Sequence, residues 1–317
     1  MSTLLVCSVG GHLAELHGLL ARIPQFGGER LWVTFDTPQS RSLLADEPTL
    51  FVDRSGPRDL RTILTNTGAA RRLLRPGHPF TAALSTGSGI ALSFLPLAAS
   101  RGVRCHYVES FTRSNGPSMT GRLLSGLPGV RLYSQHRSWT RGRWRYAGSM
   151  LDTFAPERGP AHASPAIERV VVTLGTMEDY AFPRLVERVH ALLPAGAEVL
   201  WQLGCTRMPG LAIETHESLP ERALRQAIAA ADLVIAHAGC GSALTAMEAG
   251  RMPLLVPRRA YRGENVDDHQ VELAAELRGR GLAVVREVDD LDREALLEAA
   301  AGRVLRRPEP PPFPLAA

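Results

Sequence analysis

Short apolar runs alternate with helical patterns along nearly the whole sequence, and this alternation is the feature that most limits the possible folds. Runs such as Leu4–Cys7 and Leu233–Ala236 consist mostly of apolar residues, as buried strands do. Segments such as Leu60–Leu74 instead repeat apolar residues every three or four positions, as amphipathic helices do. Strands that alternate with helices of this length predict parallel sheets covered on both faces. The predicted fold class is therefore α/β.

The predicted elements form two sets of similar size. The strands are predicted at Leu4–Cys7, Leu31–Thr34, Leu50–Val52, Ala82–Leu84, Arg104–Val108, Arg131–Tyr133, Val170–Thr173, Val199–Gln202, Leu211–Glu214, Leu233–Ala236, Leu254–Val256 and Ala283–Val285. The helices are predicted at Ala14–Arg22, Leu60–Leu74, Ile90–Arg101, Phe182–Leu193, Glu221–Ala230, Ser242–Ala249, Val266–Arg278 and Asp292–Leu305.

The alternation lapses at Asp152–Ile167, where residues 156–167 carry three prolines and a glycine. Since 317 residues are comfortable for two domains, we interpret this segment as a linker. The predicted division is a first domain at 1–155, a second at 168–305 and a proline-rich tail at 306–317. Two doubly wound domains that face each other would hold a ligand in a cleft at the carboxyl ends of their strands.

The composition argues against a membrane-spanning, secreted or zinc-binding chain. No run of about 18 apolar residues occurs, and the start of the sequence lacks the basic segment and cleavage site of a secretory signal. Four cysteines occur without a CxxC pair, so neither a disulfide framework nor a structural zinc site is expected. We therefore expect a cytoplasmic protein with reduced cysteines.

Charge is divided unevenly between the two halves. Residues 1–155 hold 18 arginines against 9 acidic residues, a net charge of +9, whereas residues 156–317 hold 18 against 23, a net charge of −5. The basic half suits an anionic lipid surface or a diphosphate-bearing acceptor, and ordinary solubility explains it equally well. We expect no nucleic-acid partner.

The strongest motif is a glycine-rich turn at His237–Ser242, between a buried strand and a short helix that Gly250 closes. Such a turn lets backbone N–H groups and a helix N-terminus approach a diphosphate, and Ser242 can cap the helix or donate to a phosphate. A dinucleotide fingerprint needs a third glycine at Leu244 and a P-loop needs Gly-Lys, and both are missing. Alone, the turn indicates a phosphate site or a plain strand–helix connection.

Polar residues after the turn favour a nucleotide-sugar over a simple phosphate. Glu248 lies on the same short helix, within reach of ribose hydroxyls. Asp268, His269 and Gln270 lie at the start of a helix that follows the next strand. Such side chains suit hydrogen bonds to sugar hydroxyls.

The amino-terminal half carries a second glycine-rich motif. Gly10 and Gly11 follow a buried strand and permit close backbone approach, and His12 heads the next helix. Glu109 follows another predicted strand and is expected to face the same cleft. Arg113 and Arg122 lie in the segments that follow it and are candidates for contact with a diphosphate or an acceptor, as are Gly10 and Gly11.

His237–Ala274 resembles the donor-binding half of the two-subunit eukaryotic transferase that adds the second N-acetylglucosamine to dolichol-diphosphate. It is similar, more loosely, to the bacterial transferase that makes the undecaprenyl-linked disaccharide-peptide of peptidoglycan. Cys7–Glu15, Tyr107–Ser114 and Ser118–Arg122 resemble the acceptor-side subunit of the eukaryotic enzyme and its bacterial exopolysaccharide relatives. The chain thus resembles a fusion of both halves, which implies the GT-B fold of two Rossmann-like domains.

The resemblance also implies roles for individual residues. It places the glycine-rich turn on the diphosphate, Glu248 on the ribose, and His269 and Gln270 at the sugar. The residues that it assigns to the donor are Gly175, Thr176, Leu219, His237, Ala238, Gly239, Gly241, Ser242, Glu248, Asp268, His269 and Gln270.

Inverting transfer needs a base that takes the proton of the acceptor hydroxyl. His12 is the expected base, because its ordinary pKa lies near neutral pH, and a structural role at its own helix is the alternative. Glu109 can orient His12, act as the base or bind the acceptor. Helix dipole and backbone amides are expected to stabilise the departing UDP without a metal or another cofactor.

We therefore predict an inverting, metal-independent transferase that moves a hexose, with N-acetylglucosamine as the leading sugar, from a UDP-sugar to a polyprenyl-(di)phosphate-linked saccharide. The eukaryotic acceptor-side subunit has a membrane anchor, so a chain without one is expected to dock at the cytoplasmic membrane face peripherally or through a partner. The alternatives are a natural-product or glycolipid transferase, a nucleotide-sugar-binding protein without catalysis, and a nucleotide-sugar epimerase.

Two weaker motifs have simpler explanations. Asp290 and Asp292 imitate a metal-binding Asp-x-Asp pair, but they precede a predicted helix and are expected to cap it. Arg258–Arg262 can contact a diphosphate or form a solvated loop.

Overall fold

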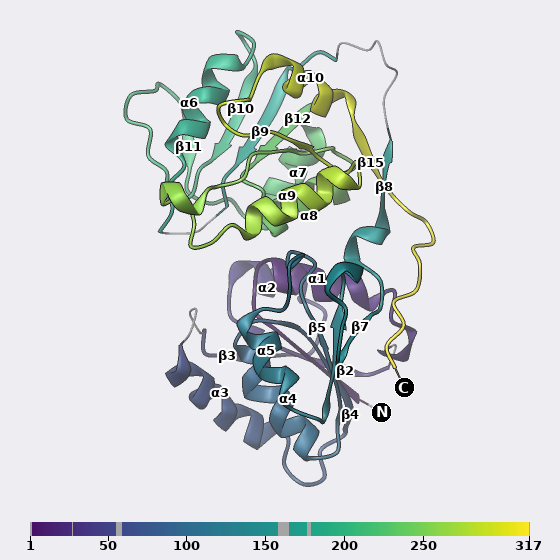
Figure 1. The fold of residues 1–317 in the computed structure, drawn as a ribbon. Coiled ribbons are helices and arrows are strands. Elements are labelled where there is room, and N and C mark those ends of the chain that lie inside the picture. Colours follow the sequence, from purple (N-terminus) through teal and green to yellow (C-terminus); the bar gives the residue numbers. More distant parts are fainter. Residues whose placement is uncertain (1, 27, 55–58, 158–164, 176–178, 317) are drawn as a thin grey trace. The chain divides into compact units, whose positions relative to one another are not determined.

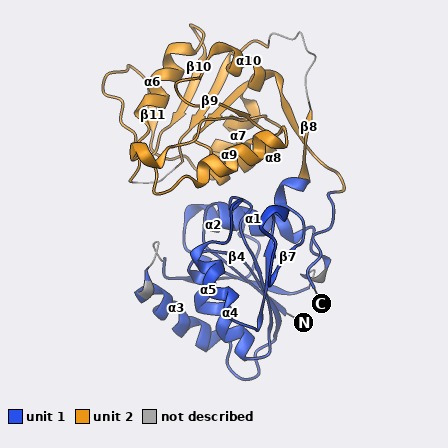
Figure 2. Cartoon of the chain, in the orientation of Figure 1, with its two compact units in different colours: residues 1–152, 310–317 blue, residues 153–309 orange. Residues whose placement is uncertain are grey.

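The computed structural model describes residues 2–26, 28–54, 59–157, 165–175 and 179–316. The chain divides into two compact units (Figures 1 and 2). Unit 1 comprises residues 1–152 and 310–317, and unit 2 comprises residues 153–309. Each unit has its own parallel sheet, which confirms the predicted α/β class.

Unit 1 is built on a seven-stranded sheet in the order β3-β2-β1-β4-β5-β6-β7, and every pairing is parallel. Its strands are β1 (Ser2–Cys7), β2 (Arg30–Phe35), β3 (Thr49–Val52), β4 (Phe80–Gly87), β5 (Arg104–Val108), β6 (Val130–Ser134) and β7 (Trp144–Tyr146). Its helices are α1 (Gly11–Leu20), α2 (Pro38–Leu43), α3 (Leu60–Leu73), α4 (Ile90–Ser100) and α5 (Met119–Ser125).

Both faces of this sheet are buried, as the unbroken apolar runs require. All six residues of β1 are buried. Leu4 and Val6 pack in a core that includes Phe94 of α4. Because neighbouring side chains on a strand point to opposite faces, Leu5 lies on the other face, which α1 covers with buried residues such as Leu16.

Unit 2 contains a six-stranded parallel sheet in the order β11-β10-β9-β12-β13-β14. Its strands are β9 (Arg169–Thr173), β10 (Glu198–Gln202), β11 (Thr215–His216), β12 (Leu233–Ala236), β13 (Leu254–Leu255) and β14 (Val284–Val285). Its helices are α6 (Pro183–Leu192), α7 (Glu221–Ala230), α8 (Cys240–Glu248), α9 (His269–Gly279) and α10 (Arg293–Ala301).

A two-stranded antiparallel ribbon lies where the sequence predicts a linker and the end of a helix. β8 (Phe154–Glu157) pairs with β15 (Arg303–Arg306), so the predicted helix Asp292–Leu305 ends at Ala301. Proline is tolerated in β8 because a two-stranded ribbon leaves one edge of each strand unpaired. Residues 158–164 of the predicted linker lie outside the described part of the chain.

The carboxyl-terminal segment belongs to unit 1. The sequence sets 306–317 apart as a proline-rich tail, whereas residues 310–317 pack with unit 1. The Phe313 side chain is fully buried. The backbone N–H of Phe313 donates to the Arg22 carbonyl over 2.8 Å, and Arg22 Nε donates to the Pro311 carbonyl. This packing joins residues almost 300 positions apart, which a local sequence pattern does not reveal.

Candidate functional site

In both sheets the strand order reverses next to a glycine-rich turn. The reversal lies between β1 and β4 in unit 1, and between β9 and β12 in unit 2. Doubly wound sheets bind ligands at the carboxyl ends of their strands, at the point of reversal. His12 lies at the start of α1 after β1, and Gly87 is the last residue of β4. Gly175 and His237 lie in the turns after β9 and β12, so each unit has one candidate site.

The turn after β12 leads directly into α8, which begins at Cys240. Gly239 is the N-cap residue, and no side chain in the described part of the chain caps the helix. Ser242 is the third residue of α8, so the predicted start at Ser242 and its capping role are wrong. The first turn of α8, which includes Gly241, therefore has backbone N–H groups that intrahelical bonds do not use. Such groups, with the helix dipole, favour an anion.

The backbone of this turn is strained. Ala238 is fully buried and has φ = 58°, in the left-handed region where a Cβ atom is unfavourable. Among the described residues, Ser88 in the turn after β4 is the other non-glycine residue with positive φ, at 69°. Strained residues of this kind concentrate at ligand sites. Each of them lies at the reversal point of its own sheet.

His237 lies between two glycines from different segments. A Cβ atom on Gly175, which has φ = 72°, would lie 2.9 Å from His237 Cε1, and one on Gly239 would overlap the ring. His237 Nδ1 is 3.3 Å from the Thr173 carbonyl oxygen. Burial and the nearby charge of Arg258 lower the pKa of His237 to about 3, so the imidazole is neutral. Thr176 lies outside the described residues.

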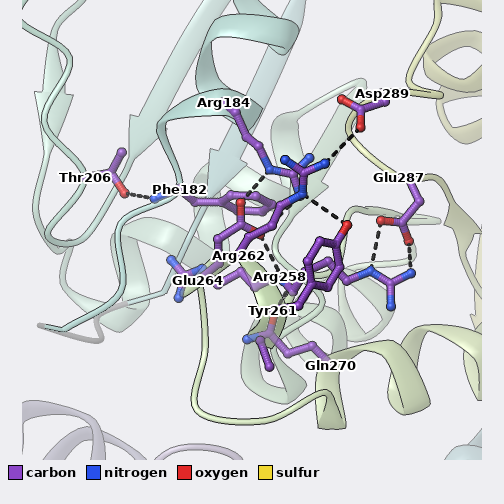
Figure 3. A network of polar contacts seen from close by, with 12 residues as sticks. Phe182, Arg184, Thr206, Arg258, Tyr261, Arg262, Glu264, Gln270, Glu287 and Asp289 are labelled. Atoms are coloured by element: carbon purple, nitrogen blue, oxygen red, sulfur yellow. Dashed lines mark hydrogen bonds and ion pairs between the residues drawn. The ribbon is translucent and has the colours of Figure 1, made fainter.

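The start of α9 is tied to the loop that precedes it (Figure 3). The helix begins at His269, not at Val266 as predicted. Asp268 Oδ1 accepts from the Ala260 N–H over 3.0 Å, and Gln270 Oε1 accepts from the Arg258 N–H over 3.1 Å. This bond fixes the Gln270 side chain and leaves its NH2 group and the second lone pair of Oε1 for a ligand.

His269, Glu248 and Leu219 complete the predicted donor residues. His269 Nδ1 contacts Asp267. Glu248 forms an ion pair with Arg225 at 2.6 Å, so contact with a ribose would require competition with that arginine. Leu219 is partly buried in the loop before α7. The donor roles of these residues stay predictions.

In unit 1, His12 lies in the first turn of α1. Gly10 is the N-cap of that helix with φ = 72°, and its N–H donates to Gln39 Oε1 over 2.7 Å. His12 Nδ1 lies 2.9 Å from the Thr86 carbonyl, which accepts the Nδ1 proton and leaves Nε2 as an acceptor. Burial lowers the pKa of His12 to about 4, so this ring is neutral near pH 7. These are the tautomer and charge that a general base needs.

Glu109 is 1% exposed and its carboxylate already has several hydrogen-bond donors. Glu109 Oε2 accepts from the N–H and the hydroxyl of Ser118 at 2.9 and 3.0 Å, and Oε1 accepts from the Tyr107 hydroxyl at 3.2 Å. Burial raises the pKa of Glu109, while these bonds and the charge of Arg113 lower it. The geometry favours a positioning role over that of a base.

The remaining candidates of unit 1 differ in their surroundings. The charge of Arg113 also lowers the pKa of His12, so this arginine lies near both predicted catalytic residues. Gly11 is the first residue of α1. Arg122 is exposed on α5, and its role stays a prediction.

The sequence reading missed a buried polar cluster beside His12. Glu15 is fully buried and accepts from the Phe111 N–H over 2.9 Å and from Gln135. Its Oε2 has no partner among the described residues. Burial raises the pKa of Glu15 to about 8. The available signal was a carboxylate three residues after His12, on the buried face of the predicted helix.

Two further predictions concern metals and membranes. Asp292 caps α10 through a 2.8 Å bond from the Ala295 N–H, which confirms the capping interpretation for Asp292. Within the described ranges, no three His, Cys, Asp or Glu side chains are grouped as a metal site. Over the same ranges, no helix is both long and apolar enough to cross a bilayer.

Comparison with known proteins agrees with the two-unit architecture. Residues 169–301 match the glycosyltransferase family 28 C-terminal domain. Over the whole chain, the fold is similar to that of Acinetobacter baumannii MurG, with a TM-score of 0.57 and 19% identity, covering 94% of this chain and 89% of that one. The protein therefore has the GT-B fold, as predicted.

Natural-product glycosyltransferases have equally similar structures. The calicheamicin glycosyltransferase CalG4 gives a TM-score of 0.55 at 18% identity, covering 95% of this chain and 90% of that one. The glycosyltransferase of kitacinnamycin gives 0.57 at 16% identity, covering 94% and 89%. At these identities the likeness concerns the fold alone.

A curated protein from Verminephrobacter eiseniae (strain EF01-2) is 30% identical over 183 residues. It is the UDP-N-acetylglucosamine–N-acetylmuramyl-(pentapeptide) pyrophosphoryl-undecaprenol N-acetylglucosamine transferase. The alignment spans about half of each chain, 49% of this one and 49% of the relative. Together the comparisons support a glycosyltransferase. The resemblance to a fusion of the two halves of the dolichol-diphosphate transferase stays a prediction.

Proposed function

We propose that the protein is an inverting glycosyltransferase that transfers a hexose from a UDP-sugar to a hydroxyl of a polyprenyl-(di)phosphate-linked saccharide. The observation that carries this proposal is the packing of Gly175 and Gly239 around His237, at the reversal point of the unit 2 sheet. This packing brings two predicted donor segments together beside the N-terminus of α8, where an anion is favoured. The same unit contains the match to the family 28 domain.

The donor and acceptor rest on separate support. N-acetylglucosamine is proposed as the sugar because the curated relative is named for its transfer. The lipid-linked acceptor is supported by the acceptor named for that relative and by the +9 net charge of residues 1–155. We place the reaction at the cytoplasmic membrane face, with peripheral docking.

In the proposed reaction, the oxygen of the acceptor hydroxyl attacks C1 of the sugar while His12 Nε2 takes the hydroxyl proton. The bond from C1 to the diphosphate breaks on the opposite face, so the configuration inverts and UDP leaves with the bonding electron pair. The unused N–H groups of α8 would stabilise the negative charge on UDP. This assignment needs no metal, and activity is expected to persist in EDTA.

The direct test is acceptor-dependent release of UDP from the purified full chain. Release from UDP-N-acetylglucosamine only when a polyprenyl-linked saccharide is added would support the proposal. Isomerised sugar without transfer would indicate an epimerase, and donor binding without turnover would indicate a binding protein. Loss of activity in EDTA that Mg²⁺ or Mn²⁺ restores would contradict the metal-independent mechanism.

A second candidate is transfer to a natural product or glycolipid. The kitacinnamycin glycosyltransferase has the same TM-score as MurG, so fold similarity does not separate the two classes of acceptor. Product formation with small lipophilic alcohols, but with no polyprenyl-linked saccharide, would favour this candidate.

A further inference from the structure

Arg258 is a buried cation whose guanidinium has little direct compensation. The residue is 1% exposed, so a solvated loop, one of the two interpretations of Arg258–Arg262, does not describe this side chain. Its Nη2 donates to the Leu174 carbonyl over 3.1 Å. Its Nε and Nη1 are buried and have no hydrogen-bond partner in the described part of the chain. Burial of a guanidinium without a carboxylate partner costs several kcal/mol, so its presence inside unit 2 needs an explanation.

The acidic residues around Arg258 are engaged by other arginines (Figure 3). The Glu264 carboxylate accepts hydrogen bonds from Arg184 Nε and Nη2 and from the Arg259 backbone N–H. The Glu287 carboxylate accepts hydrogen bonds from the Arg259 guanidinium. The Arg258 guanidinium lies over the Phe182 ring, 5.7 Å from its centre. Among the described residues, the guanidinium therefore contacts one carbonyl and one aromatic ring, but no carboxylate.

Arg258 nevertheless connects the predicted donor segments of unit 2. The carbonyl that it binds belongs to Leu174, directly before the Gly175 turn. Its backbone N–H holds Gln270 Oε1 at the start of α9. Its charge lowers the pKa of His237, which places the guanidinium near that ring. Arg258 thus lies at the centre of the proposed donor site.

The loop that carries Arg258 is held in one conformation by side chains. Three consecutive backbone N–H groups donate to side-chain oxygens: Arg258 to Gln270, Arg259 to Glu264 and Ala260 to Asp268. Glu264 is in turn fixed by the ion pair with Arg184 of α6. A loop restrained in this way keeps the buried charge at a constant place beyond the carboxyl end of β13.

We propose that Arg258 is a positioning residue for the donor, whose buried charge attracts an anionic oxygen group of the nucleotide-sugar. That group is a phosphate of the nucleotide or a carboxylate on the sugar. The guanidinium acts through its field and through Leu174 and Gln270, so it need not touch the ligand. The inference rests on the proposed function and adds a determinant of donor charge to it.

The expected effect is large because water does not screen the charge. Two unit charges ~8 Å apart at an effective dielectric constant of ~20 change a binding constant about 30-fold. Removal of the charge is therefore expected to weaken binding of an anionic donor by about 10- to 30-fold. Binding of an uncharged nucleoside is expected to change little.

The test compares Arg258→Met with Arg258→Lys by calorimetric titration of the full chain with UDP, uridine, a UDP-hexose and a UDP-hexuronic acid. Arg258→Met is expected to lower UDP affinity about 10- to 30-fold, to leave uridine affinity within about twofold, and to keep or raise Tm. Arg258→Lys retains the charge and is expected to keep most of the UDP affinity. Arg278→Met, an exposed change on α9, is the matched control.

The two anionic sources give different results. If a phosphate is the target, the Met variant loses affinity for UDP and both UDP-sugars alike. If a sugar carboxylate is the target, UDP and the hexose donor bind normally, and the preference for the hexuronic donor disappears. The first result is the one expected for the hexose donor of the proposed function. The second also supports a role of Arg258 in donor binding, but it replaces the hexose of the proposed function by a hexuronic acid.

Three results would overturn it: unchanged affinities in Arg258→Met, equal losses for UDP and uridine, or an equal loss of UDP affinity in Arg258→Lys. These outcomes leave the proposed function intact. A wild-type chain that binds neither UDP nor any UDP-sugar would instead contradict the proposed function itself.

Discussion

His12 illustrates how one residue acquires its chemistry from its neighbours. The Thr86 carbonyl accepts the Nδ1 proton, so Nε2 is the basic nitrogen. A Cβ atom on Gly87 would lie only 3.0 Å from His12 Cε1, so the glycine allows this position of the ring. Burial, and to a lesser extent the charge of Arg113, disfavour the protonated ring, which keeps His12 neutral at physiological pH.

Replacement of His12 by alanine is expected to lower kcat about 100-fold or more, because it removes the base proposed to take the acceptor proton. UDP affinity should stay near normal, since His12 belongs to unit 1. The measurement is steady-state UDP release together with titration of UDP. His17→Ala, an exposed change on the same helix, is the control. An unchanged kcat would remove His12 as the base.

The pH profile of kcat/KM should report the low pKa of His12. With a pKa of about 4, the base stays unprotonated well below the ordinary value of 6.5. The acid side of the profile is therefore expected to remain flat down to about pH 5. A fall centred near 6.5 would contradict the buried, neutral ring described above.

Glu15 predicts a pH dependence of stability. Its pKa rises from 4.5 to about 8 on folding, so the folded state holds a proton that the unfolded state releases. This contribution to the free energy of unfolding is complete below pH 4.5 and is lost as pH rises through about 8. Glu15→Gln imitates the protonated side chain and should raise stability by at least about 1 kcal/mol at pH 9.

Thermal unfolding of both proteins at pH 5 and pH 9 checks this expectation. The Tm difference between Glu15→Gln and the wild type should be small at pH 5 and favour the variant at pH 9. A constant difference at both pH values would show that Glu15 is ionised throughout this range.

At the scale of elements, the two turns at the reversal points combine strain with close packing. In unit 2, Gly239 has no room for a Cβ atom because the His237 ring occupies that space. A Cβ atom on Gly241, two residues later, would meet no described atom within 4 Å. Gly239 is therefore required by the packing of His237, whereas no described side chain requires a glycine at position 241, although the sequence motif does not distinguish the two.

Gly239→Ala is expected to lower Tm and to weaken UDP binding at least about tenfold, because the new methyl group displaces His237 from the Gly175 turn. Gly241→Ala is the matched control for stability alone, and its Tm should stay close to that of the wild type. Unfolding by heat and titration with UDP measure both effects. Equal Tm values for the two variants would contradict the close packing.

At the scale of the whole molecule, the chain passes from one unit to the other twice, at residues 152–153 and 309–310. The carboxyl-terminal segment returns to unit 1 and fixes Phe313 against Arg22, with the guanidinium 5.8 Å from the ring centre. Ala316 adds a bond from its N–H to the Tyr133 hydroxyl at 2.9 Å. The segment is thus part of the unit 1 core.

Phe313→Ala is expected to destabilise the protein by about 3 kcal/mol or more, since it removes a fully buried ring and leaves a cavity. Chemical denaturation followed by tryptophan fluorescence measures the change. Pro312→Ala, at an exposed position of the same segment, is the control and should have little effect. A similar small effect of both substitutions would mean that the segment does not contribute to the core.

Much of this organisation could be predicted from local patterns. Unbroken apolar runs such as β1 and β12 identify buried parallel strands, because a strand covered on both faces needs apolar residues at every position. The glycine-rich turns after these strands indicate anion sites, because backbone N–H groups at a helix N-terminus attract negative charge. The α/β class and the positions of the two glycine-rich turns follow from these local features.

What the tertiary structure decided depends on contacts between distant residues. Strand order places the turn after β9 beside the turn after β12, and only that order brings Gly175 against His237. The burial of Arg258 and the high pKa of Glu15 likewise arise from segments far along the chain. A sequence read locally determines which groups can bind a nucleotide-sugar, whereas the packing of distant elements determines their charge, tautomer and partners, because desolvation and hydrogen bonding depend on what surrounds them in space.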